Sequence, residues 1–200
     1  MTAKVALATS NEGKRAELAP LFEDLDLELV LPDSGLMNEI EETGQTFIEN
    51  ALIKARAVSV LMHLPAIADD SGLSVKALDG KPGIYSARYA GLPSNAVKNN
   101  EKLLTVMSEV PDGDRGASFQ CVLVFLRQPD DPVPFIGIGS WEGEILREPR
   151  GTQGFGYDPL FFVPGLNRTA AELSTGEKNR ISHRAKAATQ LLAKLRHDPR

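Results

Sequence analysis

The sequence has almost no cysteine and no long apolar run. Cys121 is its only cysteine among 200 residues, which excludes an intramolecular disulfide and a zinc site built from several thiolates. Cys121 stands in the apolar run 119–125, where we expect a buried structural thiol. No apolar run approaches the length of about 20 residues that a membrane-spanning helix needs. The apolar stretch 5–8 is too short for a signal peptide. We therefore expect a soluble, cytoplasmic protein without a membrane partner.

Positive charge is also in deficit. The sequence has 22 Lys and Arg against 27 Asp and Glu, a net charge of −5. This balance argues against a nucleic-acid or membrane-surface binder, which would present a basic face, but it leaves room for a few basic side chains around a small anion. Hydrophobic residues at 42% and charged residues at 24% are typical of a globular chain. The length suits one domain over residues 1–200, with two lobes.

Hydrophobic spacing predicts alternating strands and helices. Strands are expected over 4–8 and 27–31, and a helix over 13–25, which Pro20 fits poorly. Thr46 and Glu49 make a capping box for a helix over 46–61. Further expectations are a long loop over 79–95, a helix over 95–107, a hairpin of strands 117–126 and 134–145, a helical turn at 169–173 and a C-terminal helix marked by apolar residues from Ile181 to Leu195. This order indicates an α/β fold with a mixed sheet flanked by helices.

Two adjacent acids follow a short apolar run. Residues 66–68 predict a buried strand that runs into Asp69 and Asp70, and Ser71 and Gly72 then let the chain turn. Paired acids aimed into a crevice at the edge of a sheet can hold a divalent cation, activate a water, or do both. The alternative is a surface turn, because Asp, Ser and Gly are ordinary turn residues.

Two other segments bring charge near this position. The first strand runs into Thr9, Ser10, Asn11, Glu12, Gly13 and Lys14, and such a strand–loop–helix junction offers backbone N–H groups and a lysine to a phosphate. A capped helix start with a solvated lysine is the alternative. Glu39, Glu41 and Glu42 precede the capped helix, where they could complement its dipole or supply a ligand for a cation at Asp70. Lys54, on that helix, could reach solvent or a cleft.

The later part of the chain has residues suited to binding a nucleobase. Residues 151–159 combine glycines with Phe155, Tyr157 and Asp158. We expect both aromatic rings to project toward one side of an extended loop, where they could stack on a nucleobase while the carboxylate accepts a ring N–H. A glycine-rich turn whose aromatics cap the core is the alternative. Lys178, His183 and Arg184 are expected to open the last helix, where cations oppose the dipole and therefore indicate an anionic or polar ligand.

Taken together, these segments resemble a known family, the inosine/xanthosine triphosphate pyrophosphatases, bacterial enzymes that remove deaminated purine nucleoside triphosphates. The matching segments are Thr9-Ser10-Asn11 with Gly13-Lys14, Glu42-Thr43-Gly44, Phe47 with Asn50-Ala51 and Lys54-Ala55, Ala68 to Gly72, Pro82-Gly83 with Tyr85 to Arg88, Gly154 to Pro159, and Ser182-His183-Arg184. They occur in order along nearly the whole chain. Ser10 departs from the pattern, since the family usually has Gly there.

The resemblance implies an elongated α/β fold with two lobes around a nucleotide cleft, a homodimer, and Mg²⁺-dependent cleavage of the α–β phosphoanhydride. It implies that Asp70 is the general base, that Glu42 and Asp70 are the metal ligands, and that Thr9 to Lys14, Lys54 and Ser71 contact phosphates or sugar. Phe155, Gly156, Tyr157, Asp158, Lys178, His183 and Arg184 would form the base pocket. The role of Asp69 stays open.

Two other functions compete with this one. A nucleotide pyrophosphatase of the septum-inhibitor type shares related chemistry but prefers other bases, and the 154–158 and 182–184 segments argue against it. A nucleotide sensor that binds without cleaving is disfavoured because acids facing a triphosphate weaken binding unless a metal is present.

Overall fold

The computed structural model describes residues 2–23, 27–33, 35, 37 and 40–196. The strands and α-helices are, in chain order, β1 (Ala3–Ala8), α1 (Glu12–Leu18), β2 (Leu27–Val30), α3 (Phe47–Met62), β3 (Ala66–Val75), α4 (Ala96–Val106), β4 (Gly116–Leu126), β5 (Phe135–Ile145), β6 (Phe161–Val163), β7 (Arg168–Thr169), α5 (Thr175–Ile181) and α6 (His183–Arg196).

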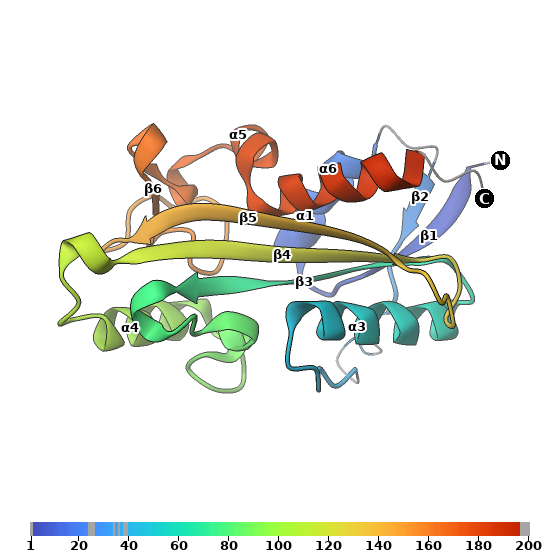
Figure 1. Ribbon diagram of the computed structural model, residues 1–200, viewed down its shortest axis with the longest axis horizontal. Coiled ribbons are helices and arrows are strands. Elements are labelled where there is room, and N and C mark those ends of the chain that lie inside the picture. The colour runs from blue at the N-terminus through green and yellow to red at the C-terminus, as the bar shows by residue number, and fades with distance from the viewer. Residues whose placement is uncertain (1, 24–26, 34, 36, 38–39, 197–200) are drawn as a thin grey trace. The chain divides into compact units, whose positions relative to one another are not determined.

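The strands form one mixed sheet in the order β2-β1-β3-β4-β5-β6-β7. β1 pairs in parallel with β2 and with β3, where Ala6 lies opposite Ala66. β5 and β6 pair antiparallel, as do β6 and β7. Figure 1 shows β4 and β5 side by side and joined by a loop at one end, so the predicted hairpin is confirmed. The α/β class with a mixed sheet and flanking helices is confirmed as well.

The chain divides into two compact units. The first comprises residues 1–70, 121–139 and 183–200, and the second comprises residues 71–120 and 140–182. Three of the four boundaries fall inside strands β3, β4 and β5, so these strands contribute residues to both units. Neither unit is a continuous piece of the chain.

The first unit is built as helices on the two faces of a sheet (Figure 1). Side chains alternate along a strand, so Val5 and Leu7 of β1 share one face while Ala6 and Ala8 share the other. The Val5 face packs against α1 and α6 in a core of Val5, Leu7, Leu18, Phe22, Ile67, Cys121, Leu123, Ala187, Ala188 and Leu191. The Ala6 face packs against α3 in a core of Ala6, Ala8, Met37, Ala51, Ala55, Val58, Ala66, Ala68, Val122, Val124 and Leu126.

The second unit has a core centred on aromatic rings. The ring centroids of Phe119 and Phe161 are 4.4 Å apart, and those of Trp141 and Phe161 are 5.2 Å apart. Leu103 and Met107 at the C-terminal end of α4 join the same core. These rings come from β4, β5 and β6, so the sheet supplies this aromatic cluster.

The predicted starts of several helices are confirmed. Thr46 caps α3 and makes the expected capping box with Glu49. Asn95 caps α4, and a 3₁₀ turn (Ala170–Glu172) follows Thr169 as predicted. The burial predicted for the Cys121 thiol is confirmed too. None of the described helices is both long and apolar enough to cross a lipid bilayer.

Other predictions of secondary structure are wrong. The single helix expected over 13–25 stops at Leu18, and a 3₁₀ turn (Ala19–Phe22) follows, because Pro20 has no N–H to continue an α-helix. Leu25 lies outside the described residues. The segment 79–95 is not one irregular loop, since it contains a 3₁₀ helix (Gly83–Arg88) and a bridge from Ser74 to Pro82.

Two further corrections affect the candidate site. The strand expected over 66–68 continues to Val75 as β3, so Asp69 and Asp70 lie within a strand and not at its end. The burial of Leu73 and Val75 in the core of the second unit keeps the backbone extended beyond Gly72. The predicted C-terminal helix is confirmed as α6, but Lys178 lies in a separate helix, α5, which ends before Ser182, and not at the start of the last helix.

Candidate active site

The loop after β1 is organised by its own side chains. Asn11 caps α1 by accepting a hydrogen bond from the Lys14 backbone N–H at 3.0 Å, and the Asn11 N–H donates to Thr9 Oγ1 at 3.1 Å. Ser10, Asn11 and Glu12 are exposed. The capped helix start that the sequence analysis gave as an alternative is therefore present. Its lysine is not solvated, however, because the Lys14 side chain turns inward.

Lys14 forms an ion pair with Asp69, whose side chain is buried. The other oxygen of that carboxylate, Oδ2, lies 3.1 Å from Cys121 Sγ and 3.5 Å from Arg184 Nε. Burial by itself would raise the pKa of Asp69, but the charges of Lys14, Arg184 and Lys54 outweigh burial and hold that pKa far below its usual value. Two cations, Lys14 and Arg184, thus face the buried Asp69 carboxylate and favour its ionised form.

Lys54 brings together the two acids expected to bind metal. Its Nζ lies 2.8 Å from Asp70 Oδ1 and 2.9 Å from Glu42 Oε1. Burial lowers the pKa of Lys54, yet the charges of Asp70 and Glu42 outweigh burial and raise the pKa overall. Burial raises the pKa of Asp70, against the opposing charges of Lys54 and Lys14. A carboxylate with a raised pKa is a better proton acceptor than an exposed one.

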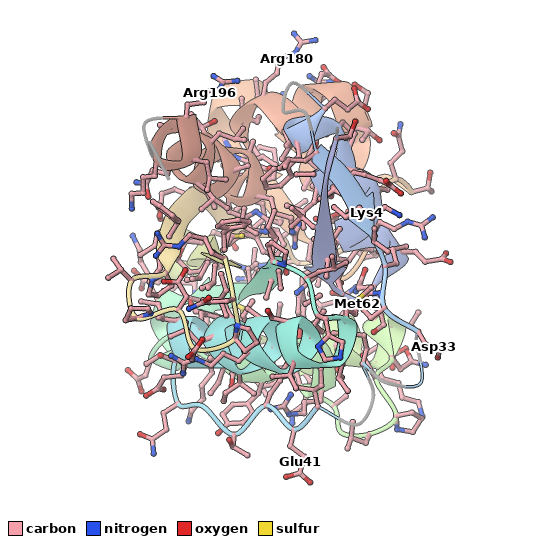
Figure 2. All side chains as sticks on the ribbon, turned by 90° about the vertical axis from the view of Figure 1, so that its right-hand side faces the viewer. Lys4, Asp33, Glu41, Met62, Arg180 and Arg196 are labelled. Atoms are coloured by element: carbon pink, nitrogen blue, oxygen red, sulfur yellow. The ribbon has the colours of Figure 1, made fainter. Side chains whose placement is uncertain are left out.

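Only one of the acids before α3 is seen to join this group. Glu41 points outward into solvent (Figure 2) and is exposed, whereas Glu42 is half-buried and paired with Lys54. Glu39 lies outside the described residues. The Gly44 N–H donates to Asn50 Oδ1 at 2.8 Å, which ties the segment carrying Glu42 to the first turn of α3.

The geometry fits a magnesium ion that is completed by substrate. Among the described residues, no three His, Cys, Asp or Glu side chains form a cluster able to hold a metal alone. Mg²⁺, however, is commonly held by one or two carboxylates together with waters and substrate phosphates. Asp70 Oδ2 is buried and has no hydrogen-bond partner among the described residues. Glu42 and Asp70 together therefore provide a donor set suited to that ion.

Arg184 is anchored by an acid that the sequence analysis did not single out. Arg184, in the first turn of α6, forms a buried ion pair with Glu17 of α1 in addition to its contact with Asp69. No pattern in the sequence distinguishes Glu17 from a solvent-facing helix residue. His183, beside it, is buried, and its carbonyl oxygen would lie 2.1 Å from a Cβ added at Gly139, so α6 packs directly on β5.

In the second unit, three residues predicted for the base pocket lie together. Asp158 Oδ2 accepts hydrogen bonds from the Phe155 N–H at 2.8 Å and from Lys178 Nζ at 2.5 Å. Lys178 Nζ also lies 5.2 Å from the centroid of the Phe155 ring. Lys178 is buried, whereas its helix neighbour Arg180 projects outward (Figure 2). Ser71, in β3, is partly exposed.

The prediction that both aromatic rings project from an extended loop is wrong. The segment is a tight turn in which Gly154 and Gly156 have φ values of 74° and 62°, a conformation that favours glycine. Tyr157 is buried in the core, and its hydroxyl donates to the Ser86 carbonyl at 2.9 Å. Phe155 is half-buried. For Tyr157 the structure supports the alternative of an aromatic residue that caps the core.

Comparisons with known proteins agree in pointing to one family. The family model of the Ham1 family matches residues 5–194. The chain is 55% identical over 194 residues, 97% of its length, to the dITP/XTP pyrophosphatase of Escherichia coli (strain K12), of which it covers 98%. It is 54% identical over 192 residues to the dITP/XTP pyrophosphatase of Xanthomonas axonopodis pv. citri (strain 306), covering 96% of each chain.

Solved structures show the same likeness. The fold is similar to that of a HAM1 protein from Coxiella burnetii, with a TM-score of 0.87 and 46% identity, covering 98% of this chain and 100% of that one. A nucleoside-triphosphatase / dITP/XTP pyrophosphatase from Mycobacterium abscessus has a TM-score of 0.73 and 41% identity, with coverage of 98% and 100%.

Proposed function

This chain belongs to the Ham1 family, and we propose that it is a nucleoside triphosphate pyrophosphatase that acts on nonstandard purine nucleotides. Its substrates would be dITP, ITP, XTP and dXTP, each cleaved to the monophosphate and pyrophosphate. The activity after which these relatives are named supports this assignment. The structural observation that carries it is the meeting of Glu42 and Asp70 at the Lys54 ammonium group, with a buried Asp70 oxygen left for a further ligand.

The basic side chains would neutralise the triphosphate. A triphosphate carries about four negative charges, and these repel a nucleophile unless cations face them. Lys14 and Lys54 supply two positive charges, and the loop 9–13 offers further N–H donors besides those of Thr9 and Asn11, which are bonded within the chain. We propose that these groups and Ser71 contact the phosphates and sugar.

The chemical step would be attack of water on the α-phosphorus. Asp70 would hold the water and take its proton as the new P–O bond forms, and the bond between the α-phosphorus and the bridging oxygen would break to release pyrophosphate. Glu42 and Asp70 would hold Mg²⁺, which would lower the pKa of bound water and neutralise phosphate charge. The raised pKa of Asp70 suits its role as proton acceptor.

Base selectivity would come from hydrogen-bond donors. Hypoxanthine and xanthine carry a 6-keto acceptor where adenine carries a 6-amino donor. Guanine shares the keto group, so its 2-amino group would have to be what the pocket excludes. We propose that Arg184, Lys178 and the backbone of His183 donate to this keto group, that the Phe155 ring stacks on the base, and that Gly156, Tyr157 and Asp158 hold Phe155 and Lys178 in place. Burying mismatched donors can cost a factor on the order of 10⁴ in efficiency.

We extend the proposal to a homodimer that acts in the cytoplasm and removes deaminated purine nucleotides from the free nucleotide pool. The mass of the purified protein from light scattering tests the dimer. Mutation frequency in a strain that lacks the protein and is treated with a deaminating agent tests the cellular role.

Product analysis tests the activity. Purified protein is incubated with Mg²⁺ and separately with dITP, XTP, dATP and dGTP in water enriched in ¹⁸O. We expect monophosphate and pyrophosphate from dITP and XTP, with the label in the monophosphate, and little product from dATP or dGTP. Diphosphate plus orthophosphate would exclude attack at the α-phosphorus. Turnover of other bases would favour the septum-inhibitor type, and binding without turnover would favour a sensor.

A further inference from the structure

Ser86 is a buried serine that bonds to two other parts of the second unit. It lies in the 3₁₀ helix (Gly83–Arg88), and its exposed fraction is 7%. Its Oγ accepts a hydrogen bond from the Leu73 N–H of β3 at 2.8 Å and donates to the Gly83 carbonyl at 2.6 Å. Its carbonyl oxygen accepts a hydrogen bond from the Tyr157 hydroxyl at 2.9 Å. Ser86 therefore joins β3 to the turn that contains Tyr157, within the second unit.

The bond to β3 continues the pairing along one edge of that strand. Backbone N–H groups two residues apart in a strand point to the same edge. The Val75 N–H donates to the Lys81 carbonyl at 3.1 Å, and at Leu73 the Ser86 hydroxyl takes the place of a backbone carbonyl. Ser71 comes two residues before Leu73 in the same strand. Ser86 therefore holds the backbone of β3 next to Ser71.

The bond to Tyr157 reaches the turn that is proposed to hold the base. Tyr157 comes two residues after Phe155, whose N–H donates to Asp158 Oδ2 at 2.8 Å. The Tyr157 ring is packed in the core of the unit, so this packing determines where its hydroxyl lies. Burial raises the pKa of Tyr157, and the hydroxyl therefore remains a hydrogen-bond donor at neutral pH.

Helix α4 holds the backbone that follows Ser86. The exposed fraction of Asn99 is 4%, its Nδ2 donates to the Ala87 carbonyl at 3.0 Å, and its Oδ1 accepts from the Ala90 N–H at 2.7 Å. Networks in which each polar group is bonded are rigid. Ser86 is therefore a fixed point to which both β3 and the turn are attached.

We propose that Ser86 is a positioning residue for the nucleoside: it sets the separation between Ser71 and Phe155. This inference rests on the proposed function, in which Ser71 contacts phosphate or sugar and Phe155 stacks on the base. A ligand that touches both residues must match their separation, and binding weakens when that separation varies. Inorganic tripolyphosphate would meet the lysines of the first unit without a base contact, so its binding would not depend on Ser86.

The test is Ser86→Ala, which removes the hydroxyl that the Leu73 N–H contacts. We expect the KM for dITP to rise roughly 10-fold and kcat to stay within about threefold of wild type, because Glu42, Lys54 and Asp70 all lie in the first unit. The inhibition constant of tripolyphosphate should stay within about twofold of wild type. An unchanged KM for dITP, or equal losses for dITP and tripolyphosphate, would overturn the proposal.

Ser59→Ala is the matched control. Ser59 is buried too, and its hydroxyl donates to the Leu64 carbonyl at 2.7 Å, but it lies on α3 in the first unit. This variant should lose stability in denaturant unfolding and keep the wild-type KM for dITP. A rise in its KM equal to that of Ser86→Ala would show that KM follows stability, which would overturn the proposal.

Tyr157→Phe tests the junction from its other side, and it takes over if Ser86→Ala does not fold. It removes the hydroxyl that bonds to the Ser86 carbonyl, so the KM for dITP should rise roughly fivefold with kcat and tripolyphosphate inhibition kept. In the double variant the rise in KM should be well below the product of the two single rises, because both substitutions break one junction. A fully multiplicative rise, or a wild-type KM in Tyr157→Phe, would contradict the proposal.

Binding measurements separate this inference from the proposed function. If the wild-type protein cleaves no triphosphate, the proposed function fails, and calorimetry with dIMP decides the role of Ser86. Binding of dIMP that is roughly 10-fold weaker in Ser86→Ala would support the inference. Equal binding by variant and wild type, or no binding of dIMP to the wild type, would reject it.

Discussion

The ammonium nitrogen of Lys54 lies 2.8 Å from Oδ1 of Asp70, in a buried ion pair. The same Asp70 carboxylate is the proposed proton acceptor. We expect Asp70→Asn to lower kcat for dITP by about 10³-fold, because an amide cannot take a proton from water. Binding of dITP should stay within roughly fivefold of wild type, since one acid facing the phosphates is removed.

Single-turnover kinetics and equilibrium binding of dITP measure the two effects separately. Asp130→Asn is the control, because Asp130 is exposed in the loop between β4 and β5. Near-normal turnover in Asp70→Asn would remove Asp70 from catalysis.

Gly44 leaves no room for a side chain where the segment carrying Glu42 meets α3. A Cβ at this position would lie 2.6 Å from Glu49 Cβ and 2.7 Å from Asn50 Oδ1. Gly44→Ala should therefore displace Glu42 and raise the Mg²⁺ concentration for half-maximal activity about 10-fold or more. A Mg²⁺ titration of activity measures this shift. Gly165→Ala, where a Cβ would meet nothing within 4 Å, should titrate like the wild type.

Asn100 joins α4 to the turn that carries Phe155. Its Nδ2 donates to the Gly156 carbonyl at 2.9 Å, and its buried Oδ1 has no hydrogen-bond partner among the described residues. Asn100→Leu removes both a hydrogen bond and an unsatisfied acceptor, so the free energy of unfolding should change by less than about 1 kcal/mol. The KM for dITP should rise roughly threefold as the turn loosens. Denaturant unfolding and steady-state kinetics test the two parts, and a large loss of stability with unchanged KM would contradict the prediction.

The Asp131 carboxylate fixes the loop between β4 and β5. It accepts hydrogen bonds from Arg127 Nη2 at 2.5 Å, from Arg127 Nε at 2.7 Å and from the Val133 N–H at 3.0 Å. These bonds hold the pKa of Asp131 below its usual value, and the hydrogen bonds from the Arg127 side chain contribute most. Asp131→Asn should lower the free energy of unfolding by about 2 kcal/mol at pH 7.

The pH dependence of that loss has a definite sign. A carboxyl group whose pKa is lower in the folded chain stabilises the fold above its unfolded pKa of about 4, and this contribution is lost as the pH falls toward the folded value. The difference between wild type and Asp131→Asn should therefore shrink below about pH 4. Chemical denaturation at pH 7, 5 and 3 measures it, and a constant difference would contradict the pKa argument.

The sequence predicted those helices and strands that are determined by residues close together in the chain. The capping box of Thr46 and Glu49, the cap at Asn95 and the strand pair 117–126 and 134–145 all have their cause in neighbouring side chains. The strand β3 was cut short in the prediction because Asp69, Asp70 and Gly72 are locally typical of a turn. Their extended backbone depends on distant partners, including Cys121 beside Asp69.

In the candidate site, too, some residues could be found from the sequence and others only from the structure. Glu42, Lys54 and Asp70 could be selected from the sequence because Asp70 is one of two adjacent acids after an apolar run and because all three lie in segments that resemble the pyrophosphatase family. The structure brings these three together. Glu17 could not be found in this way, since it looks like any charged residue on a helix until Arg184 packs against it. Tyr157 was misplaced because the glycines on either side of Phe155 turn the backbone instead of extending it.

The sheet of the first unit begins with the first strand of the chain and is covered by its last helix. Val5 and Leu7 of β1 pack against Ala187 and Leu191 of α6, which are separated from them by almost the whole length of the chain. During synthesis this apolar face of β1 therefore has only the α1 side of its cover until α6 has left the ribosome. A chain that terminates before α6 leaves part of that face exposed to water, so we expect incomplete products to be prone to aggregation.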